Sequence, residues 1–199
     1  MMNFINVLVS LILLLSFSLW GFSYRELQIS DYQDIILEIE KGKIYTNLEK
    51  IHNTLGVVTV IGKIDASIEI VWKLIQSDND KIYPDILEKQ ILNQEGNRII
   101  KKSLLNFPWP LSDRWTVYDE EINEKIFAKE WKEIGGDIKI NRGAIRLFPY
   151  RNNSTIMIFK LSFDPGLKFV PEWAIELGMK YKAPSIIDRI RYCLKYCNE

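Results

Sequence analysis

A series of six strand-like segments in the middle of the chain constrains the fold more than any other feature. Glycine and asparagine turns at residues 95–97, 135–137 and 151–153 separate several of them, which is typical of antiparallel neighbours. Because side chains alternate along a strand, the last segment has one largely apolar face. The segments predict one antiparallel sheet, with strands at residues 88–92, 98–105, 115–122, 126–134, 143–148 and 155–163.

Two helices and two further strands are predicted before this sheet. Residues 31–40 have isoleucines at helical spacing, with Asp31 as the expected N-cap, and strands are expected at 43–46 and 56–64. The second helix follows Ser67 and ends at Gln76. Its buried stripe, at positions i, i+3, i+4 and i+7, is expected to comprise Ile68, Val71, Trp72 and Ile75.

A long helix is predicted to close the chain. Pro171 suits its first position, and Pro184 should kink or divide it because proline lacks the N–H that a helix interior requires. The full order of elements predicts an α+β fold, with a curved antiparallel sheet wrapped around the C-terminal helix. A sheet that grips a helix in this way tends to leave an internal cavity, and we find no linker or repeat that would divide residues 24–199.

The first 23 residues have the composition of a targeting segment. They carry no charged side chain, residues 7–15 are a largely apolar run, and the small residues Gly21 and Ser23 occupy the −3 and −1 positions of a cleavage site. We therefore expect residues 1–23 to be a signal peptide and the protein to be periplasmic or secreted. A membrane anchor formed by residues 4–22 and a buried first helix of the domain remain alternatives, since Met1-Met2-Asn3 lacks the usual Lys or Arg.

Charge and residue counts exclude several classes of function. The chain has 26 Lys and Arg and 26 Asp and Glu, so it lacks the positive charge of a general nucleic-acid binder. A single histidine, His52, excludes metal sites that need two histidines, and two cysteines are too few for a disulfide scaffold. We expect no metal and no cofactor. Cys193 and Cys197 are expected to pack in the apolar stripe of the last helix, and a disulfide between them is an alternative.

Several short motifs occur in an order that resembles the START lipid-transfer family, within the Bet v 1-like (SRPBCC) helix-grip superfamily. Phe107-Pro108-Trp109-Pro110-Leu111-Ser112-Asp113-Arg114 is similar to the family's strand connection and is the most specific match. Two departures are Trp115-Thr116 after the arginine, where an acid and an aromatic are usual, and Leu167 in place of a glycine. The other matching motifs are Ile64-Asp65-Ala66-Ser67, Tyr83-Pro84, Asp164-Pro165-Gly166 and Ala183-Pro184-Ser185.

The resemblance implies a tunnel that holds one lipid or other hydrophobic small molecule and opens by movement of a loop or of the closing helix. It brings no catalytic residues. We also expect a monomer that contacts a membrane transiently, with Leu111 either as one contact or as a lone exposed leucine. Arg114 is the first choice for holding the ligand's polar head through its planar guanidinium. The residues expected to line the cavity are Arg114, Trp109, Trp115, Trp131, Arg146, Met157, Phe159 and Trp173.

Alternatives remain open for these residues and for the function. Each aromatic could simply pack in the core, Arg114 could pair with Asp113 or Asp85, and Arg146 could lie on the outer face of the sheet. The leading hypothesis is non-catalytic binding, with transfer or sequestration of one hydrophobic ligand. The alternatives are a cyclase or hydrolase acting in the same pocket, which would need an acid or base of perturbed pKa, and an envelope interaction module with a filled cavity.

Overall fold

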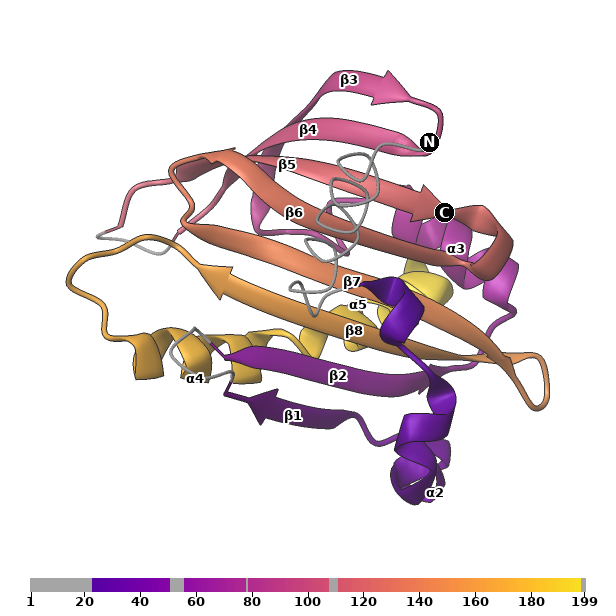
Figure 1. The fold of residues 1–199 in the computed structure, drawn as a ribbon. Helices are drawn as coiled ribbons and strands as arrows, with labels where there is room; N and C mark the ends of the chain where they lie inside the picture. Colours follow the sequence, from indigo (N-terminus) through magenta and orange to yellow (C-terminus); the bar gives the residue numbers. More distant parts are fainter. Residues whose placement is uncertain (1–22, 51–55, 78, 108–110, 198–199) are drawn as a thin grey trace, which may run out of the picture.

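A computed structural model describes residues 23–50, 56–77, 79–107 and 111–197. Eight antiparallel strands form one curved sheet in the order β1-β2-β8-β7-β6-β5-β4-β3, so that β2 pairs with both β1 and the last strand, β8 (Figure 1). The strands are β1 (Tyr45–Glu49), β2 (Val57–Ile64), β3 (Ile86–Glu95), β4 (Arg98–Leu105), β5 (Arg114–Asn123), β6 (Ala128–Gly136), β7 (Ile140–Tyr150) and β8 (Ser154–Asp164).

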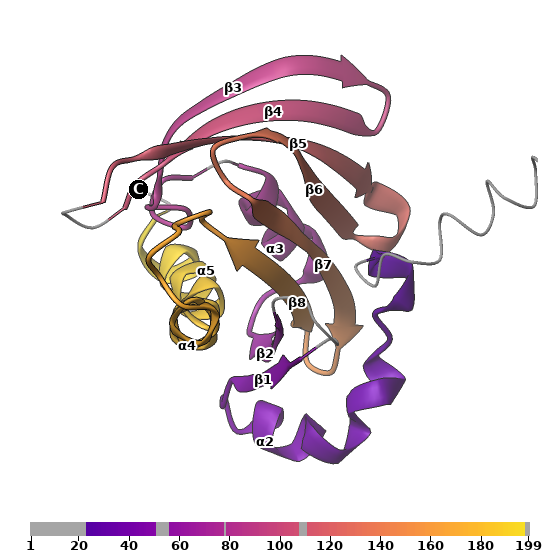
Figure 2. The same ribbon diagram turned by 60° about the vertical axis from the view of Figure 1, so that its left-hand side comes forward.

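Three helices lie inside the curve of this sheet, as Figure 2 shows. They are α3 (Ile68–Gln76), α4 (Glu172–Lys182) and α5 (Ser185–Tyr196). Pro184 separates α4 from α5, which confirms the predicted division of the closing helix. The predicted stripe of α3 is buried, and Ser67 stands at its N-cap position. The α+β fold with a sheet gripping the C-terminal helices is therefore confirmed.

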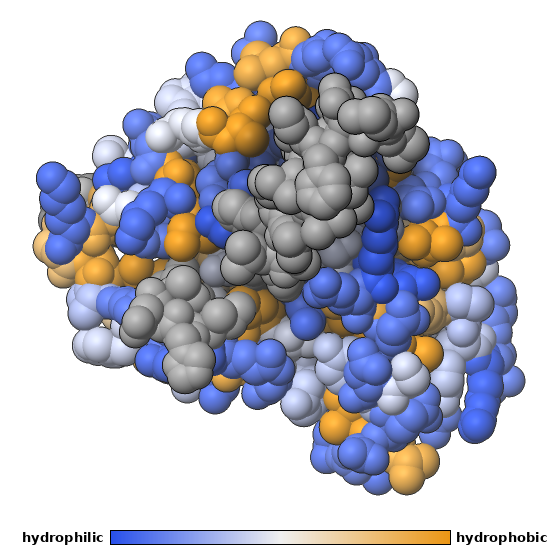
Figure 3. All heavy atoms as spheres, viewed as in Figure 1, coloured by the Kyte–Doolittle hydropathy of each residue, from blue (hydrophilic) through white to orange (hydrophobic). Residues whose placement is uncertain are grey.

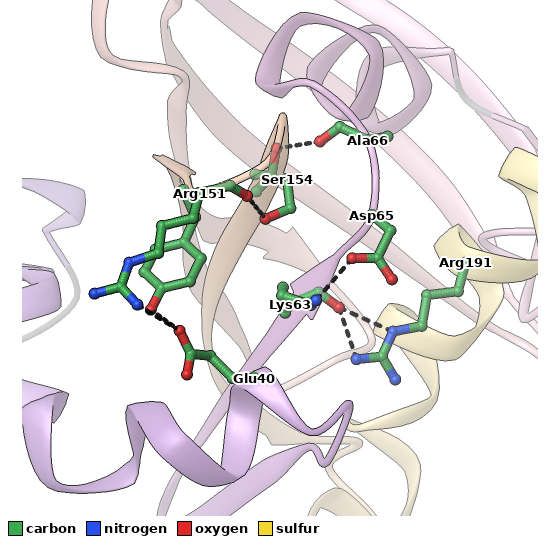
Figure 4. Close-up of polar contacts among 9 residues, drawn as sticks. Glu40, Lys63, Asp65, Ala66, Arg151, Ser154 and Arg191 are labelled. Carbon is green, nitrogen blue, oxygen red and sulfur yellow. Dashed lines mark hydrogen bonds and ion pairs between the residues drawn. The ribbon is translucent and has the colours of Figure 1, made fainter.

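The largest apolar core fills the space between the concave face and the three helices. Ile187 and Ile190 of α5 are fully buried there, together with Val60 of β2. Gly62 permits the close approach of α5, since a Cβ at this position would lie 2.8 Å from the Ile187 Cδ1 atom. The Arg191 guanidinium donates two hydrogen bonds, of 3.0 and 2.7 Å, to the carbonyl of Lys63 and so fastens α5 to β2 (Figure 4).

A second apolar core covers the convex face, which the sequence did not indicate. The segment from Tyr24 to α2 (Ile36–Glu40) crosses this face, with the side chains of Tyr24, Leu27 and Ile39 almost fully buried. Glu40 accepts a 2.5 Å hydrogen bond from the Tyr150 hydroxyl, which ties the segment to the turn between β7 and β8 (Figure 4). The middle strands are therefore covered on both faces.

The structure corrects several predicted boundaries near the N-terminus. Only Ile36–Glu40 is α-helical in the predicted 31–40 helix, because Ile29–Ile35 is a 3-10 segment with Tyr32 in a non-helical conformation. Asp31 is therefore not an N-cap. The first strand begins at Tyr45 rather than at residue 43, and residues 124–126 form a short 3-10 helix (η3) before β6 rather than extending that strand to residue 126. None of the helices in the described ranges is long and apolar enough to span a membrane.

Cys193 and Cys197 are joined by a disulfide, with their Cα atoms 4.5 Å apart. The bond is possible at this spacing because α5 ends at Tyr196 and Cys197 is the residue that caps it. Cys193 is also fully buried in the concave core, so the expected packing holds alongside the bond that the sequence left open.

Candidate functional site

A cavity of about 580 Å³ lies between the concave face of the sheet and helices α4 and α5. Asn106, Gly178 and Lys182 line it and are exposed, so they mark its mouth. Further along β4 and β5, the lining residues Lys101, Ser103, Thr116 and Glu120 are buried. The volume falls within the range typical of a pocket for one drug-sized molecule.

One wall of the cavity is apolar. It is built by Phe159, Leu161 and Phe163 on one face of β8, and by side chains of α4 that point back toward the sheet. The sulfur of Met179 in α4 accepts a 3.1 Å hydrogen bond from the Phe163 N–H, which positions the helix against the end of β8. The remaining apolar contributions come from Ile82, Ile86, Leu105, Phe107, Leu111, Ile145, Pro165, Leu167, Val170, Ala174, Ile175, Ala183 and Ile186.

The opposite wall, on β4, β5, β6 and the start of β7, is polar. The Trp131 indole N–H donates to the Asn141 side-chain oxygen at 3.1 Å, and the Asn141 amide in turn donates to the Thr116 hydroxyl at 3.2 Å. The hydroxyls of Ser103 and Tyr118 lie 3.4 Å apart. All five residues line the cavity, so a bound molecule would meet apolar surface on one side and hydrogen-bonding groups on the other.

A charged cluster, defined as Lys101, Glu120 and Lys129, forms the inner part of the polar wall. The Lys101 ammonium lies 2.6 Å from one Glu120 carboxylate oxygen, and the Lys129 ammonium lies 3.2 Å from the other. The three residues come from β4, β5 and β6 and all line the cavity, although none is more than 9% exposed. Charged side chains are seldom buried to this degree unless they are paired, as these are.

The surroundings within the cluster favour the charged forms of Glu120 and Lys129. Burial by itself would raise the pKa of the Glu120 carboxyl, but the Lys129 and Lys101 ammonium groups together hold this pKa below its ordinary value. Burial would likewise lower the pKa of Lys129, yet the nearby oxygens of Tyr83, Glu120 and Tyr118 raise it. Burial raises the pKa of Tyr118, so its phenol stays protonated.

Two of the predicted site residues line the cavity. Trp131 and Phe159 stack with ring centroids 6.1 Å apart, one on each wall. Gly143 leaves room for the indole of Trp131, because a Cβ there would lie 2.5 Å from the ring. Met157 is fully buried in the concave core and does not line the cavity. Contact of Trp131 and Phe159 with a ligand stays a prediction.

The arginines and Trp115 require a correction. Arg146 lies on the convex face, where it donates a 2.8 Å hydrogen bond to the Leu27 carbonyl and lies over the ring of Phe148. Trp115 lies on the opposite face of β5 from Thr116, with the Lys102 ammonium 4.2 Å from its ring centroid. Arg114 is at the start of the strand and is not among the lining residues; its guanidinium reaches the Asp137 carbonyl at 3.4 Å.

Trp173 is also outside the cavity. It is 65% exposed, on the face of α4 that points to solvent, next to Leu177 and Tyr181 at helical spacing. Trp109 and His52 lie outside the described residues. Leu111 is half-buried at the mouth.

Sequence reasoning missed the charged cluster, although alternation along the strands contained a signal. Lys101, Ser103 and Leu105 share one face of β4, and Thr116, Tyr118 and Glu120 share one face of β5. A lysine and a glutamate at such positions look like ordinary solvent-facing residues until the partner helices are in place. Only the assembled sheet shows that these faces point inward.

Comparison with solved structures identifies the fold. The chain superposes on a STAR-related lipid transfer protein fragment from Xanthomonas axonopodis with a TM-score of 0.64 and 16% identity, covering 76% of this chain and 93% of that one. The chain has the helix-grip fold of START domains. Human STARD10 shares this fold with a TM-score of 0.62 and 14% identity, over 86% of this chain and 81% of that one.

The helix-grip fold is also found in an enzyme among these structures. The Zhui aromatase/cyclase from Streptomyces superposes with a TM-score of 0.56 and 12% identity, over 71% of this chain and 97% of that one. No protein-family model and no curated protein matches the sequence. At these identities the likeness establishes the helix-grip fold, and the function has to be argued from the cavity itself.

Proposed function

We propose that this protein binds one hydrophobic or amphipathic molecule in the cavity and carries or sequesters it, as a monomer and without chemical conversion. The observation that carries the proposal is the cavity of about 580 Å³ with one apolar wall. Removing apolar ligand surface from water would supply about 25 cal/mol per Å² buried. The lipid transfer proteins of the same fold support this reading.

The electrostatics of the cavity favour binding over catalysis. The Zhui aromatase/cyclase shows that the fold can host an enzyme. A general acid or base works best with a pKa near the working pH. The pKa of Glu120 is instead lowered by two ammonium groups, so the carboxylate stays ionised and paired. Such a group is suited to orienting a ligand rather than to exchanging protons with it.

Native mass spectrometry of residues 24–199, purified without detergent, tests the proposal. We expect one bound small molecule per chain, recovered by organic extraction and identified from its mass. A protein that is empty and also takes up nothing from a membrane extract would overturn the proposal.

We further propose that residues 1–23 are removed as a signal peptide and that the protein works outside the cytoplasm. The disulfide between Cys193 and Cys197 supports an oxidising compartment. The surroundings of Tyr24 also suit a new N-terminus, because its backbone nitrogen lies 2.9 Å from a Glu130 carboxylate oxygen. Burial, with a contribution from Glu121, raises the pKa of Glu130, and an ammonium at this place would relieve that effect.

The mature protein is therefore expected to begin at Tyr24, as read by N-terminal sequencing of exported material. Its new ammonium group would pair with half-buried Glu130, so Glu130→Gln should cost the mature protein about 1 kcal/mol of unfolding free energy. The same substitution should cost less in a protein with one extra alanine before Tyr24. An intact mass that retains residues 1–23 would favour the membrane-anchor alternative.

We also propose that α4 touches a membrane during loading. Phe169 precedes α4 and is 74% exposed, and Trp173, Leu177 and Tyr181 continue this apolar surface along the helix. Figure 3 shows apolar surface at the edge of the molecule where β8 runs into α4, near the cavity mouth. Burying such residues in the interfacial region of a bilayer is favourable.

Substituting Trp173 and Leu177 by serine should slow ligand transfer between vesicles by at least about tenfold, because both lose apolar burial at the membrane, and full burial of one such side chain is worth roughly 1.5–3 kcal/mol. Equilibrium affinity for a soluble ligand should be unchanged, since neither residue lines the cavity. Tyr192→Ser is a matched control, as Tyr192 is 53% exposed on α5 and does not line the mouth. Equal slowing by the control would contradict the membrane role of α4.

A further inference from the structure

We propose that the ligand carries an acidic head group, a carboxylate or a phosphate monoester, and that this head binds at the charged cluster with the tail directed toward α4 and the mouth. The inference rests on the proposed function and specifies the chemistry of the molecule bound. It follows from where the charged cluster lies, from its net charge, and from what its charges contribute to folding.

The cluster lies at the buried end of the cavity. Thr116 and Glu120 line the same face of β5 and are four residues apart, which is about 13 Å along a strand. Asn106 and Gly178 mark the mouth beyond the other end of this row. A ligand that enters at the mouth therefore reaches the charged cluster last, with one end of the molecule.

The charge of the cluster is not balanced. Two ammonium groups face one carboxylate, so the cluster carries a net charge of +1. Within the described part of the chain, Glu120 is the carboxylate that forms an ion pair with either lysine. Each ammonium has three N–H donors, and Glu120 engages one from each. An anionic head would complete both the charge balance and the hydrogen bonding.

The stability of the fold does not by itself explain why three charged side chains are buried in the cavity wall. Burying ions is costly, and replacing a buried ion cluster by apolar residues of similar volume is often neutral or stabilising. The apolar wall opposite shows that such residues suit this cavity. An excess positive charge in a site that also holds apolar surface is what an acidic amphipathic molecule would require.

The two walls also set the expected order of affinity among ligands with different head groups. An anionic head gains charge-assisted hydrogen bonds from Lys101 and Lys129, which are about twice as strong as neutral ones. A hydroxyl head gains ordinary hydrogen bonds and leaves the excess charge unpaired. An ammonium head is repelled by both lysines. A purely apolar tail would be held by the same wall in each case.

Calorimetric titration of the protein with four ligands that share one tail tests the inference. The ligands are dodecanoate, dodecyl phosphate, dodecanol and dodecylammonium, each used below the concentration at which it aggregates. We expect the two acids to bind about tenfold more tightly than dodecanol, and dodecylammonium to bind most weakly. The carboxylate and phosphate arms show which acid the site prefers.

Lys129→Met is the informative variant, because methionine keeps most of the length of the unbranched side chain and leaves Lys101 and Glu120 as a neutral pair. The preference for dodecanoate over dodecanol should fall from about tenfold to near parity. Lys102→Met is the matched control. Lys102 follows Lys101 on β4, and its substitution also removes one positive charge. Its ammonium lies over the ring of Trp115, outside the cavity, so the preference for dodecanoate over dodecanol should persist.

The outcomes separate this inference from the function on which it rests. Equal binding of dodecanoate and dodecanol by the native protein would overturn the acidic head group and leave the apolar carrier intact. Binding of none of the four ligands would count against the carrier itself. The comparison on the native protein decides the matter even if Lys129→Met does not fold.

Discussion

Replacing Ser103 by phenylalanine should weaken binding of any ligand in the cavity by about a hundredfold. Ser103 is fully buried on the cavity face of β4, between Lys101 and Leu105, and is the smallest side chain of that row. A benzyl group at this position would project from the sheet into the volume that the ligand needs. Uptake of the uncharged dye Nile red, followed by fluorescence, measures the effect.

The control for this experiment is Ser103→Ala, which keeps the cavity open. It removes only a 3.4 Å contact with the Tyr118 hydroxyl, so dye binding should stay close to that of the native protein. The free energy of unfolding of the phenylalanine variant should fall by about 1–3 kcal/mol, which is the typical cost of a larger side chain at a buried position. Full dye binding by a folded phenylalanine variant would show that ligands bind elsewhere.

Replacing Glu120 by glutamine should lower the free energy of unfolding by about 3–5 kcal/mol. The substitution keeps the shape of the side chain but leaves the two buried ammonium groups of Lys101 and Lys129 without a counter-charge. Urea denaturation at neutral pH measures the loss. Asp119→Asn, one residue earlier on the other face of β5, is the matched control. Its partner Arg98 is largely exposed, so the cost should stay within about 1 kcal/mol.

The pH dependence of stability gives an independent check on Glu120. Its folded-state pKa lies below the ordinary value of 4.5, chiefly because Lys129 and Lys101 outweigh the effect of burial. A carboxyl with a lowered pKa stabilises the fold above the unfolded-state pKa, and this stability is lost as the pH falls through the lower folded-state value. The free energy of unfolding of Glu120→Gln should therefore fall less steeply than that of the native protein as the pH is lowered. The same decline at acidic pH in the variant and the native protein would contradict the pairing of Glu120 with Lys101 and Lys129.

The local sequence pattern indicates some of the aromatic residues of the cavity but not its charged residues. Trp131 and Phe159 line the cavity as predicted, because aromatic residues on the inner face of a sheet are the ones that reach its interior. The prediction for Arg146 is wrong, since the strand that holds it has buried residues on both faces. Arg114 is predicted from a motif, but the basic groups that line the cavity are provided by β4, β6, α4 and α5.

The local pattern of the chain by itself determined the strands, the α3 helix and the division of the closing helix at Pro184. These follow from short-range physics: alternation of side chains along a strand, the period of a helix, and the missing N–H of proline. The same reasoning predicted a sheet around a helix and hence a cavity. It needed no knowledge of which distant residues meet.

The tertiary structure alone decided which charges face inward. Lys101, Glu120 and Lys129 are 9 or more residues apart along the chain and become neighbours only when β4, β5 and β6 pair in register. The covering of the convex face by the segment around Tyr24 likewise depends on contacts between residues more than 100 positions apart, such as Tyr24 and Glu130. Burial and electrostatic pairing are properties of the assembled molecule, because each depends on groups that a local pattern does not contain.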